Sequence, residues 1–204
     1  MSEPPGDAPA DHMDGLTVTD CERCPALVES RSRIVSGVGP ADADLVFVGE
    51  APGAEEDARG EPFVGRSGDV LDAALRDVGL SRADVRITNC VRCRPPDNRD
   101  PHAAELDNCR SYLEVELARL DPEMIVTLGK VPAEHLLGRD VAVTAEAGDT
   151  DRVDLGGETR LVMVCLHPAA KLYDNSTAER FEATIAAAAD YVDSDGGQQR
   201  LGDF

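Results

Sequence analysis

The sequence contains no tryptophan, and aromatic residues of all kinds make up only 3% of its 204 residues. Lysine is almost as scarce, because only Lys130 and Lys171 are lysines among 20 basic residues, against 40 acidic ones. No apolar run approaches the roughly 20 residues that a bilayer demands, which excludes a membrane span, and the composition also excludes collagen and a coiled coil. The net charge of -20 indicates an acidic, hydrated surface typical of a halophilic protein, and says nothing of fold or activity.

The amino-terminal segment lacks the basic flank and apolar core of a secretory signal, so we expect a cytoplasmic protein. Structural disulfides are rare in that reducing compartment, which makes the six cysteines candidate metal ligands. The polar residues 1–14 and 193–204 are predicted to be flexible tails around one domain at residues 15–192. The last seven residues, from Gln198 to Phe204, resemble a truncated peptide that binds a sliding clamp, but an ordinary tail is the simpler interpretation. We expect a monomer.

Short apolar runs alternate with helical patterns along the chain. The runs 45–48, 85–88, 124–128 and 161–166 are typical of buried strands. Apolar residues at helical spacing predict helices that begin near Ser67, Leu106, Ala133 and Ala178. This alternation predicts an α/β fold in which helices cover both faces of a parallel sheet.

Unusual polar segments directly follow three of the predicted strands. These segments are Gly49-Glu50-Ala51-Pro52-Gly53, the segment that begins at Asn89, and His167-Pro168. Ligands of such sheets bind beyond the carboxyl ends of the strands, so we expect the three segments to form one cleft.

Each polar or aromatic candidate has a functional and a structural interpretation. Glu50, between turn residues at a strand end, suits the positioning of a water, whereas Glu55 and Asp57 are better explained as surface charge. Phe63, in a loop of turn formers, is either a core residue or a platform on which a planar ring stacks. The Asn89 amide could read a nucleobase edge or cap a turn. His167 could donate to a developing anion or make a structural hydrogen bond.

The cysteines give the clearest pattern, with two CxxC pairs at Cys21-Cys24 and Cys90-Cys93. By spacing alone the two pairs would form a tetrahedral zinc site. The competing set replaces Cys90 with Cys109 and would hold an iron-sulfur cluster. Local spacing does not decide between the two sets.

Together these residues closely resemble the family 4 uracil-DNA glycosylases, an iron-sulfur group. The motifs GEAPG, EPFVGRSG, ITNCVRCRPPDNRDP and LHPAA, with the later Cys109, occur in the order and spacing of that family. The resemblance implies a three-layer α/β/α sandwich with a four-stranded parallel sheet, and a [4Fe-4S] cluster. Its ligands would be Cys21, Cys24, Cys93 and Cys109.

The resemblance also implies an activity, namely excision of uracil from single- and double-stranded DNA to leave an abasic site for base excision repair. Phe63 corresponds to the stacking residue, Asn89 to the amide that reads uracil, and His167 to the residue that stabilises charge on uracil O2. Glu50 corresponds to the acid that orients water, with Glu56 as second choice. Backbone N–H groups of Gly49, Ala51 and Gly53 would contact the base.

A DNA-binding strip on so acidic a chain must be local, and we expect it to contain Arg92, Arg94, Arg99 and Lys171. The basic loop KRRIH of covalently trapping relatives is absent, which argues against those relatives, and we expect a monofunctional enzyme. Two other classes stay open at this point: a zinc-stabilised nucleic-acid-binding module without catalysis, and an iron-sulfur electron-transfer protein. Electron transfer would not need the set of Phe63, Asn89 and His167.

Overall fold

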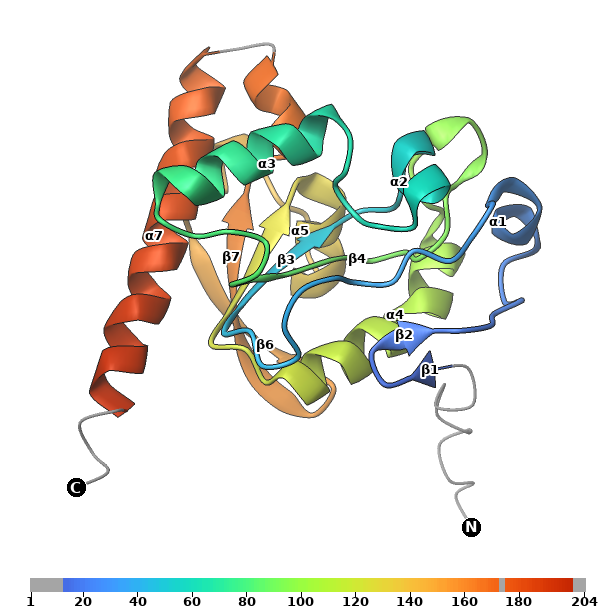
Figure 1. The fold of residues 1–204 in the computed structure, drawn as a ribbon, viewed down its shortest axis with the longest axis horizontal. Coiled ribbons are helices and arrows are strands. Elements are labelled where there is room, and N and C mark those ends of the chain that lie inside the picture. The colour runs from blue at the N-terminus through green and yellow to red at the C-terminus, as the bar shows by residue number, and fades with distance from the viewer. Residues whose placement is uncertain (1–12, 173–174, 200–204) are drawn as a thin grey trace.

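The computed structural model describes residues 13–172 and 175–199, and its centre is a five-stranded sheet (Figure 1). The strand order is β4-β3-β5-β7-β6, with four neighbouring strands parallel and β6 antiparallel to β7. All four predicted strands are therefore present, and they are parallel as predicted. The strands of the sheet are β3 (Leu45–Gly49), β4 (Arg86–Asn89), β5 (Met124–Leu128), β6 (Thr150–Leu155) and β7 (Glu158–Cys165).

The fifth strand, β6, corrects the prediction of a four-stranded sheet. Its sequence TDRVDL has only two apolar residues, and five of its six positions are exposed or half-buried. A strand at the edge of a sheet is commonly polar, since one side of it has no partner strand. The apolar-run criterion that found the four buried strands therefore could not find this one.

Four of the helices were predicted and are confirmed, namely α3, α4, α5 and α7. The unpredicted helices α1, α2 and α6 have only six, six and four residues, too few for a periodic pattern. Helix α7 continues past the predicted domain end at Val192 to Gln199, and strand β1 begins at Met13, within the predicted first tail. The remaining elements are β1 (Met13–Asp14), β2 (Thr17–Val18), α1 (Pro25–Ser30), α2 (Ala54–Arg59), α3 (Arg66–Asp77), η2 (Pro96–Asn98), α4 (Ala103–Leu120), α5 (Lys130–Leu137), α6 (Val143–Glu146), η3 (Pro168–Leu172) and α7 (Asn175–Gln199).

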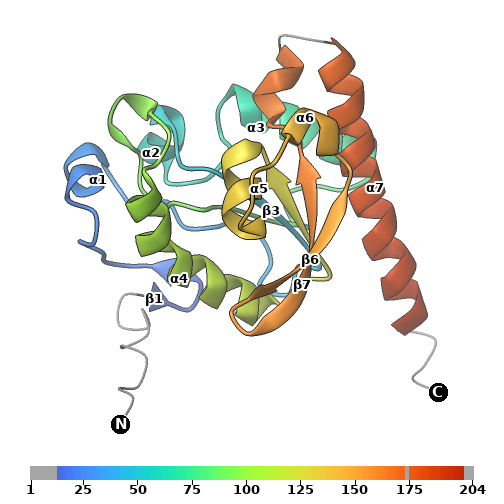
Figure 2. The same ribbon diagram turned by 180° about the vertical axis from the view of Figure 1, so that it is seen from behind.

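The helices form two layers, one on each face of the sheet (Figures 1 and 2). Leu45 and Phe47 of β3 pack with residues of α3 and α7, whereas Val46 and Val48 pack with residues of α4 and α5. This alternation follows from the period of two along a strand. Burying each such side chain stabilises the fold by about 1.5–3 kcal/mol, and the result is the predicted α/β/α sandwich. Within the described ranges, no helix is long and apolar enough to cross a membrane.

Candidate functional site

A cavity of about 300 Å³ lies where strands β3, β4 and β7 end. The three polar segments that follow these strands meet there, as the sequence predicts. Gly49 lies directly behind the cavity, because a Cβ on it would be 2.4 Å from Asn89 Oδ1 and 2.5 Å from the Phe63 ring. A larger residue at this position would displace both side chains. The cavity is lined by Glu50, Ala51, Gly53, Glu56, Phe63, Ser67, Asn89, Asn98 and His167.

Asn89, the last residue of β4, offers the cavity an unused hydrogen-bond donor. Its side chain is 1% exposed, and its Nδ2 has no hydrogen-bond partner in the described part of the chain. An unpaired buried amide of this kind costs about 1–3 kcal/mol, so its retention in a cavity indicates a ligand that accepts from it. The alternative interpretation, an amide that only caps a turn, leaves this donor unexplained.

His167 follows β7 and faces the cavity as a neutral donor. The backbone N–H of Ala169 donates to its Nδ1 at 3.1 Å, which places the ring proton on Nε2. Burial lowers the pKa of this imidazole below its usual range, against the opposing effect of Glu56. The ring is therefore neutral at pH 7, with an N–H at Nε2.

Phe63 lies across from His167, with ring centroids 6.1 Å apart and planes inclined at 36°. The Phe63 backbone has a φ of +53°, a left-handed conformation that costs a bulky residue roughly 1–2 kcal/mol. Such strain persists only where surrounding contacts impose it, and it is concentrated at functional sites.

Glu56 ties the Phe63 loop to the turn that follows β3. One of its oxygens accepts from the backbone N–H groups of Val64 and Gly65 at 3.1 and 3.2 Å. The other accepts from the Gly53 N–H at 3.1 Å. Three donors occupy this carboxylate, so it acts on the shape of the cavity more than on a bound molecule.

Glu50 differs from Glu56 in having no hydrogen bond from any described residue to its carboxyl group. Burial, with a smaller effect of nearby Asp100, raises the pKa of this carboxyl from 4.5 to about 7. A raised pKa of this size is typical of a carboxyl group used in acid-base chemistry. Of the two acids, Glu50 is thus the one free to hold a water.

Four of the six cysteines gather beside α4. Cys93 and Cys109 are buried in one hydrophobic cluster, and Cys21 and Cys24 pack against it. Cys90 belongs to a different cluster, on the α4 and α5 face of the sheet. This separation agrees with the ligand set that the resemblance implies, and leaves Cys90 as a core residue.

Three of the four gathered sulfurs already accept N–H hydrogen bonds. Arg31 Nη1 donates to Cys93 at 3.0 Å, the backbone N–H of Arg92 donates to Cys109 at 3.4 Å, and Asn108 Nδ2 donates to Cys24 at 3.4 Å. Donors of this kind stabilise thiolates that bind a metal cluster. The surroundings therefore fit a group with negatively charged sulfur ligands.

The described residues contain no preformed site for a single metal ion. Among residues 13–172 and 175–199, no three His, Cys, Asp or Glu side chains converge closely enough to hold one. Tetrahedral zinc needs its thiolates within about 2.3 Å of one point. Cys90 lies in a different hydrophobic cluster from Cys21, Cys24 and Cys93, so the zinc interpretation of the two CxxC pairs is not favoured.

Comparison with protein families matches residues 36–190 to the model of the uracil DNA glycosylase superfamily. The chain belongs to this superfamily. A type-4 uracil-DNA glycosylase of Archaeoglobus fulgidus is 39% identical over 170 residues, which cover 81% of this chain and 85% of that protein. One of Thermotoga maritima is 40% identical over 165 residues, 80% and 83% of the two chains. A type-5 uracil-DNA glycosylase of Pyrobaculum aerophilum is 32% identical over 182 residues, 74% and 79% of the two chains.

Of the four basic residues predicted to contact DNA, Arg92 does not fit that role. Its side chain is 2% exposed and pairs with Glu116, which is completely buried and also pairs with Arg86 at 2.8 Å. Burial without a partner would be costly for a guanidinium, and Glu116 of α4 supplies that partner. Arg92 is therefore a structural residue, which corrects the prediction.

The other three basic candidates differ in how far their side chains are engaged in contacts within the protein. Arg99 makes a two-pronged pair with Glu105, at 2.7 Å for each contact, and Arg94 donates from Nε to Asn98 at 2.7 Å. Both remain partly exposed. The side chain of Lys171 lies outside the described residues, as does the end of the clamp-like segment.

Two further residues line the cavity and are not among the predicted site residues: Ser67, predicted only as the start of a helix, and Asn98. Asn98 lies in η2, and both it and Asp97 have left-handed backbones, with φ of +54° and +53°. Consecutive left-handed residues that are not glycine are a signal of function only once the backbone is known. The sequence showed only a proline-rich loop.

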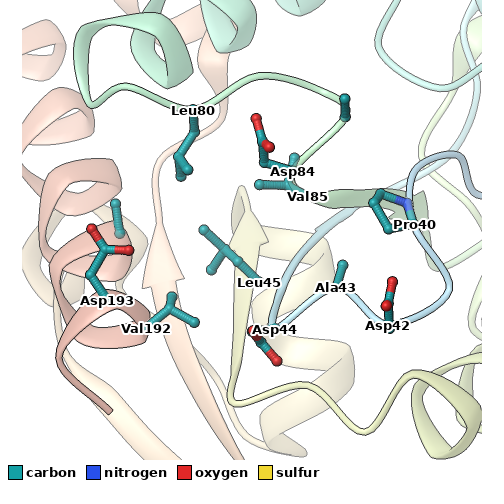
Figure 3. A pocket seen from close by; sticks show the side chains of 12 residues that line it. Pro40, Asp42, Ala43, Asp44, Leu45, Leu80, Asp84, Val85, Val192 and Asp193 are labelled. Atoms are coloured by element: carbon teal, nitrogen blue, oxygen red, sulfur yellow. The ribbon is translucent and has the colours of Figure 1, made fainter. Parts of the chain in front are cut away.

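A second cavity, also of about 300 Å³, lies at the opposite edge of the sheet, where β3 and β4 begin (Figure 3). None of the predicted functional residues lines it. Its charged residues are all aspartates, and its floor is apolar. The labelled side chains include Asp42, Asp44, Asp84 and Asp193 around Leu45, Leu80, Val85 and Val192.

Proposed function

We propose that this member of the superfamily removes uracil from single- and double-stranded DNA and leaves an abasic site for base excision repair. The observation that carries the proposal is the buried, unpaired amide donor of Asn89 in one cavity with a neutral His167 and the Phe63 ring. Uracil within a duplex is out of reach, so the nucleotide must rotate out of the stack to enter the cavity.

Recognition of uracil rests on the two ends of the Asn89 amide. Nδ2 donates to uracil O4, and Oδ1 accepts from uracil N3–H. Cytosine presents a donor and an acceptor in reversed order, which leaves each mismatched buried group unpaired at a cost of about 1–3 kcal/mol. Stacking on Phe63 adds roughly 1–3 kcal/mol for any planar base, so it supports binding while Asn89 supplies selectivity.

Bond cleavage depends on stabilising the negative charge of the departing base. When the bond between uracil N1 and the sugar C1′ breaks, its electron pair moves to the base and is shared with O2. The Nε2–H of His167 donates to O2 at this point. The lowered pKa of His167 keeps it a neutral donor, so no charge is buried before the bond breaks.

Hydrolysis is completed by a water that adds to C1′ of the positively charged sugar. Ionised Glu50 orients this water, accepts its proton and favours the positive charge on the sugar. Asn98, whose Oδ1 is occupied by Arg94, can present its Nδ2 to the same water. Glu56 instead holds the loop and the turn that form the walls of the cavity.

Cys21, Cys24, Cys93 and Cys109 would hold a [4Fe-4S] cluster. When bound, the cluster supplies cross-linking of the chain and no step of the bond cleavage. Arg31 links the segment that carries Cys21 to the segment that carries Cys93. It donates to the Cys93 sulfur and, at 2.8 Å, to the backbone oxygen of Cys21. Together with a bound cluster, these contacts would fix the loop that leads from Cys93 to Asn98 at the rim of the cavity.

Contacts with the DNA backbone would come from Arg94, Arg99 and Lys171. Salt weakens such contacts: the logarithm of the binding constant falls with the logarithm of the salt concentration, with a slope of about -0.9 per neutralised phosphate. A halophilic enzyme with a net charge of -20 would depend more on the base cavity than on this strip, and so keep its activity at molar salt. We further propose a cytoplasmic monomer; all six cysteines are free of disulfides, which suits a reducing compartment.

The test is incubation of anaerobically purified protein with a fluorescent oligonucleotide containing one uracil, at low and molar KCl, followed by alkali. We expect strand cleavage at uracil only, with matched oligonucleotides containing thymine or cytosine left intact. Iron and sulfide analysis of the same preparation tests the cluster. An intact uracil strand, with a control glycosylase active, would contradict the proposal.

A further inference from the structure

The left-handed backbone of Phe63 needs something to hold it, and Glu56 holds only the N–H groups that follow it. The carbonyl groups of Pro62 and Phe63 both accept hydrogen bonds from one side chain, Arg82, which lies 19 residues farther along the chain. Nη1 of Arg82 donates to Pro62 O at 3.1 Å, and Nη2 donates to Phe63 O.

Arg82 is itself held in place from α3. Its Nε donates to Asp72 Oδ1 at 2.7 Å, and both side chains are partly buried. The three nitrogens of the guanidinium thus each donate in a fixed direction, which a planar fork can do and a lysine cannot. Arg82 does not line the cavity, so it cannot act on a substrate directly.

Gly68 completes this arrangement in the first turn of α3. A Cβ on Gly68 would lie 1.7 Å from Phe63 O and 3.2 Å from Arg82 Nη2. The Phe63 carbonyl is therefore pressed against the backbone of α3 while Arg82 donates to it. Glu56 thus holds the N–H groups of Val64 and Gly65, while Arg82 holds the carbonyl groups of Pro62 and Phe63.

We propose that Arg82 is a positioning residue for base binding, which holds Phe63 in its left-handed conformation so that the ring forms a wall of the cavity. The proposal rests on the proposed function, because the wall is where the flipped uracil would stack. Removal of the guanidinium lets the loop relax to negative φ, and the ring then leaves the position that faces His167.

The decisive experiment combines Arg82→Ala with Phe63→Ala in a double-mutant cycle of uracil excision. We expect Arg82→Ala to lower kcat/KM by about tenfold or more, within the effect of losing one stacked base. In the Phe63→Ala background the same change should cost little further, since the two residues act through one ring. Arg82→Lys should restore activity only in part. Equal losses in both backgrounds would overturn the proposal.

Arg76→Ala is the matched control, since Arg76 is an exposed arginine of α3 whose side chain makes no hydrogen bond or ion pair with the described residues. It removes the same charge and should leave excision unchanged. Amide hydrogen exchange of the peptide spanning residues 60–66 should speed up in Arg82→Ala and not in Arg76→Ala. Unchanged exchange would overturn the proposal. If the wild-type protein excised no uracil, the proposed function would fail, but the exchange data would still decide whether Arg82 holds the loop.

Discussion

The two cavities of equal volume at opposite edges of the sheet differ in chemistry rather than in size. The first cavity lies at the carboxyl ends of the parallel strands, here called the carboxyl edge. It has a buried amide with an unpaired donor, a neutral imidazole and an aromatic ring on a strained backbone. The cavity at the amino edge has an apolar floor and exposed aspartates (Figure 3). Strained and unpaired groups are costly, so they mark the edge at which selection has favoured function over stability.

The sharpest way to test this comparison is to remove the two groups aimed into the carboxyl-edge cavity. We expect His167→Ala and Asn89→Ala each to lower excision about 10²–10³-fold, the usual cost of losing one donor to a developing anion or a buried reader. Melting temperature and iron content should stay close to wild type. Single-turnover rates would measure the loss, and an active His167→Ala variant would contradict the assigned role.

The next effect concerns the cysteines behind the same edge. Cys109→Ala should lose most of the bound iron and sulfide and part of the folding stability, because one of four ligands is gone. Cys90→Ala is the matched control, since it removes a buried sulfur from the other core cluster and should cost only about 1–2 kcal/mol. Iron loss in Cys90→Ala but not in Cys109→Ala would reverse the ligand assignment.

A smaller effect, graded with pH, is expected from Glu50. Its pKa of about 7 means that the carboxylate needed to hold water is lost as pH falls, so kcat/KM should drop about tenfold per pH unit below 7. The carboxyl group ionises near pH 4.3 in the unfolded chain but only near pH 7 in the folded protein. The free energy of unfolding therefore falls as pH rises from about 4.3 to about 7. Glu50→Gln should remove both effects.

The measurement for Glu50 is therefore a pair of pH profiles. Glu50→Gln should have a low and nearly flat excision rate, and above pH 7 it should melt higher than wild type. Discounted for solvent screening, the gain is on the order of 1 kcal/mol, or about 2–4 °C. A wild-type profile that is flat between pH 5 and 8 would argue that Glu56 or Asn98 holds the water instead.

Much of the carboxyl edge could be predicted because its causes are local in sequence. Four strands were evident as apolar runs, and polar residues directly after a parallel strand must lie at one edge of the sheet. Asn89 and His167 were therefore placed together correctly without coordinates. Strand β6 was missed because its sequence is polar, and Asn98 because an Asp-Asn pair is common in turns and does not itself show that its side chain lines a cavity.

The failure at Arg92 has a different cause. Its partner Glu116 lies 24 residues away on α4. No local sequence pattern predicts that an arginine close to two cysteines will be buried. The same holds for Arg82, whose importance comes from two carbonyl groups of a distant loop. Contacts that join distant segments decide which charged residues are structural, and only the folded arrangement supplies them.

The smallest effects should come from the amino-edge cavity, where Asp84→Asn is the informative change. The hydroxyl and backbone N–H of Ser81 hold the pKa of Asp84 below its usual range, through contacts of 2.6 and 2.8 Å. A carboxyl group whose pKa is lowered in the folded protein stabilises the fold at pH values above its pKa in the unfolded chain. This contribution disappears as the pH falls below that value. Asp84→Asn should thus melt slightly below wild type at pH 7, converge with it in acid, and excise uracil at the wild-type rate. Loss of excision comparable to that of His167→Ala would mean that the two cavities had been assigned the wrong way round.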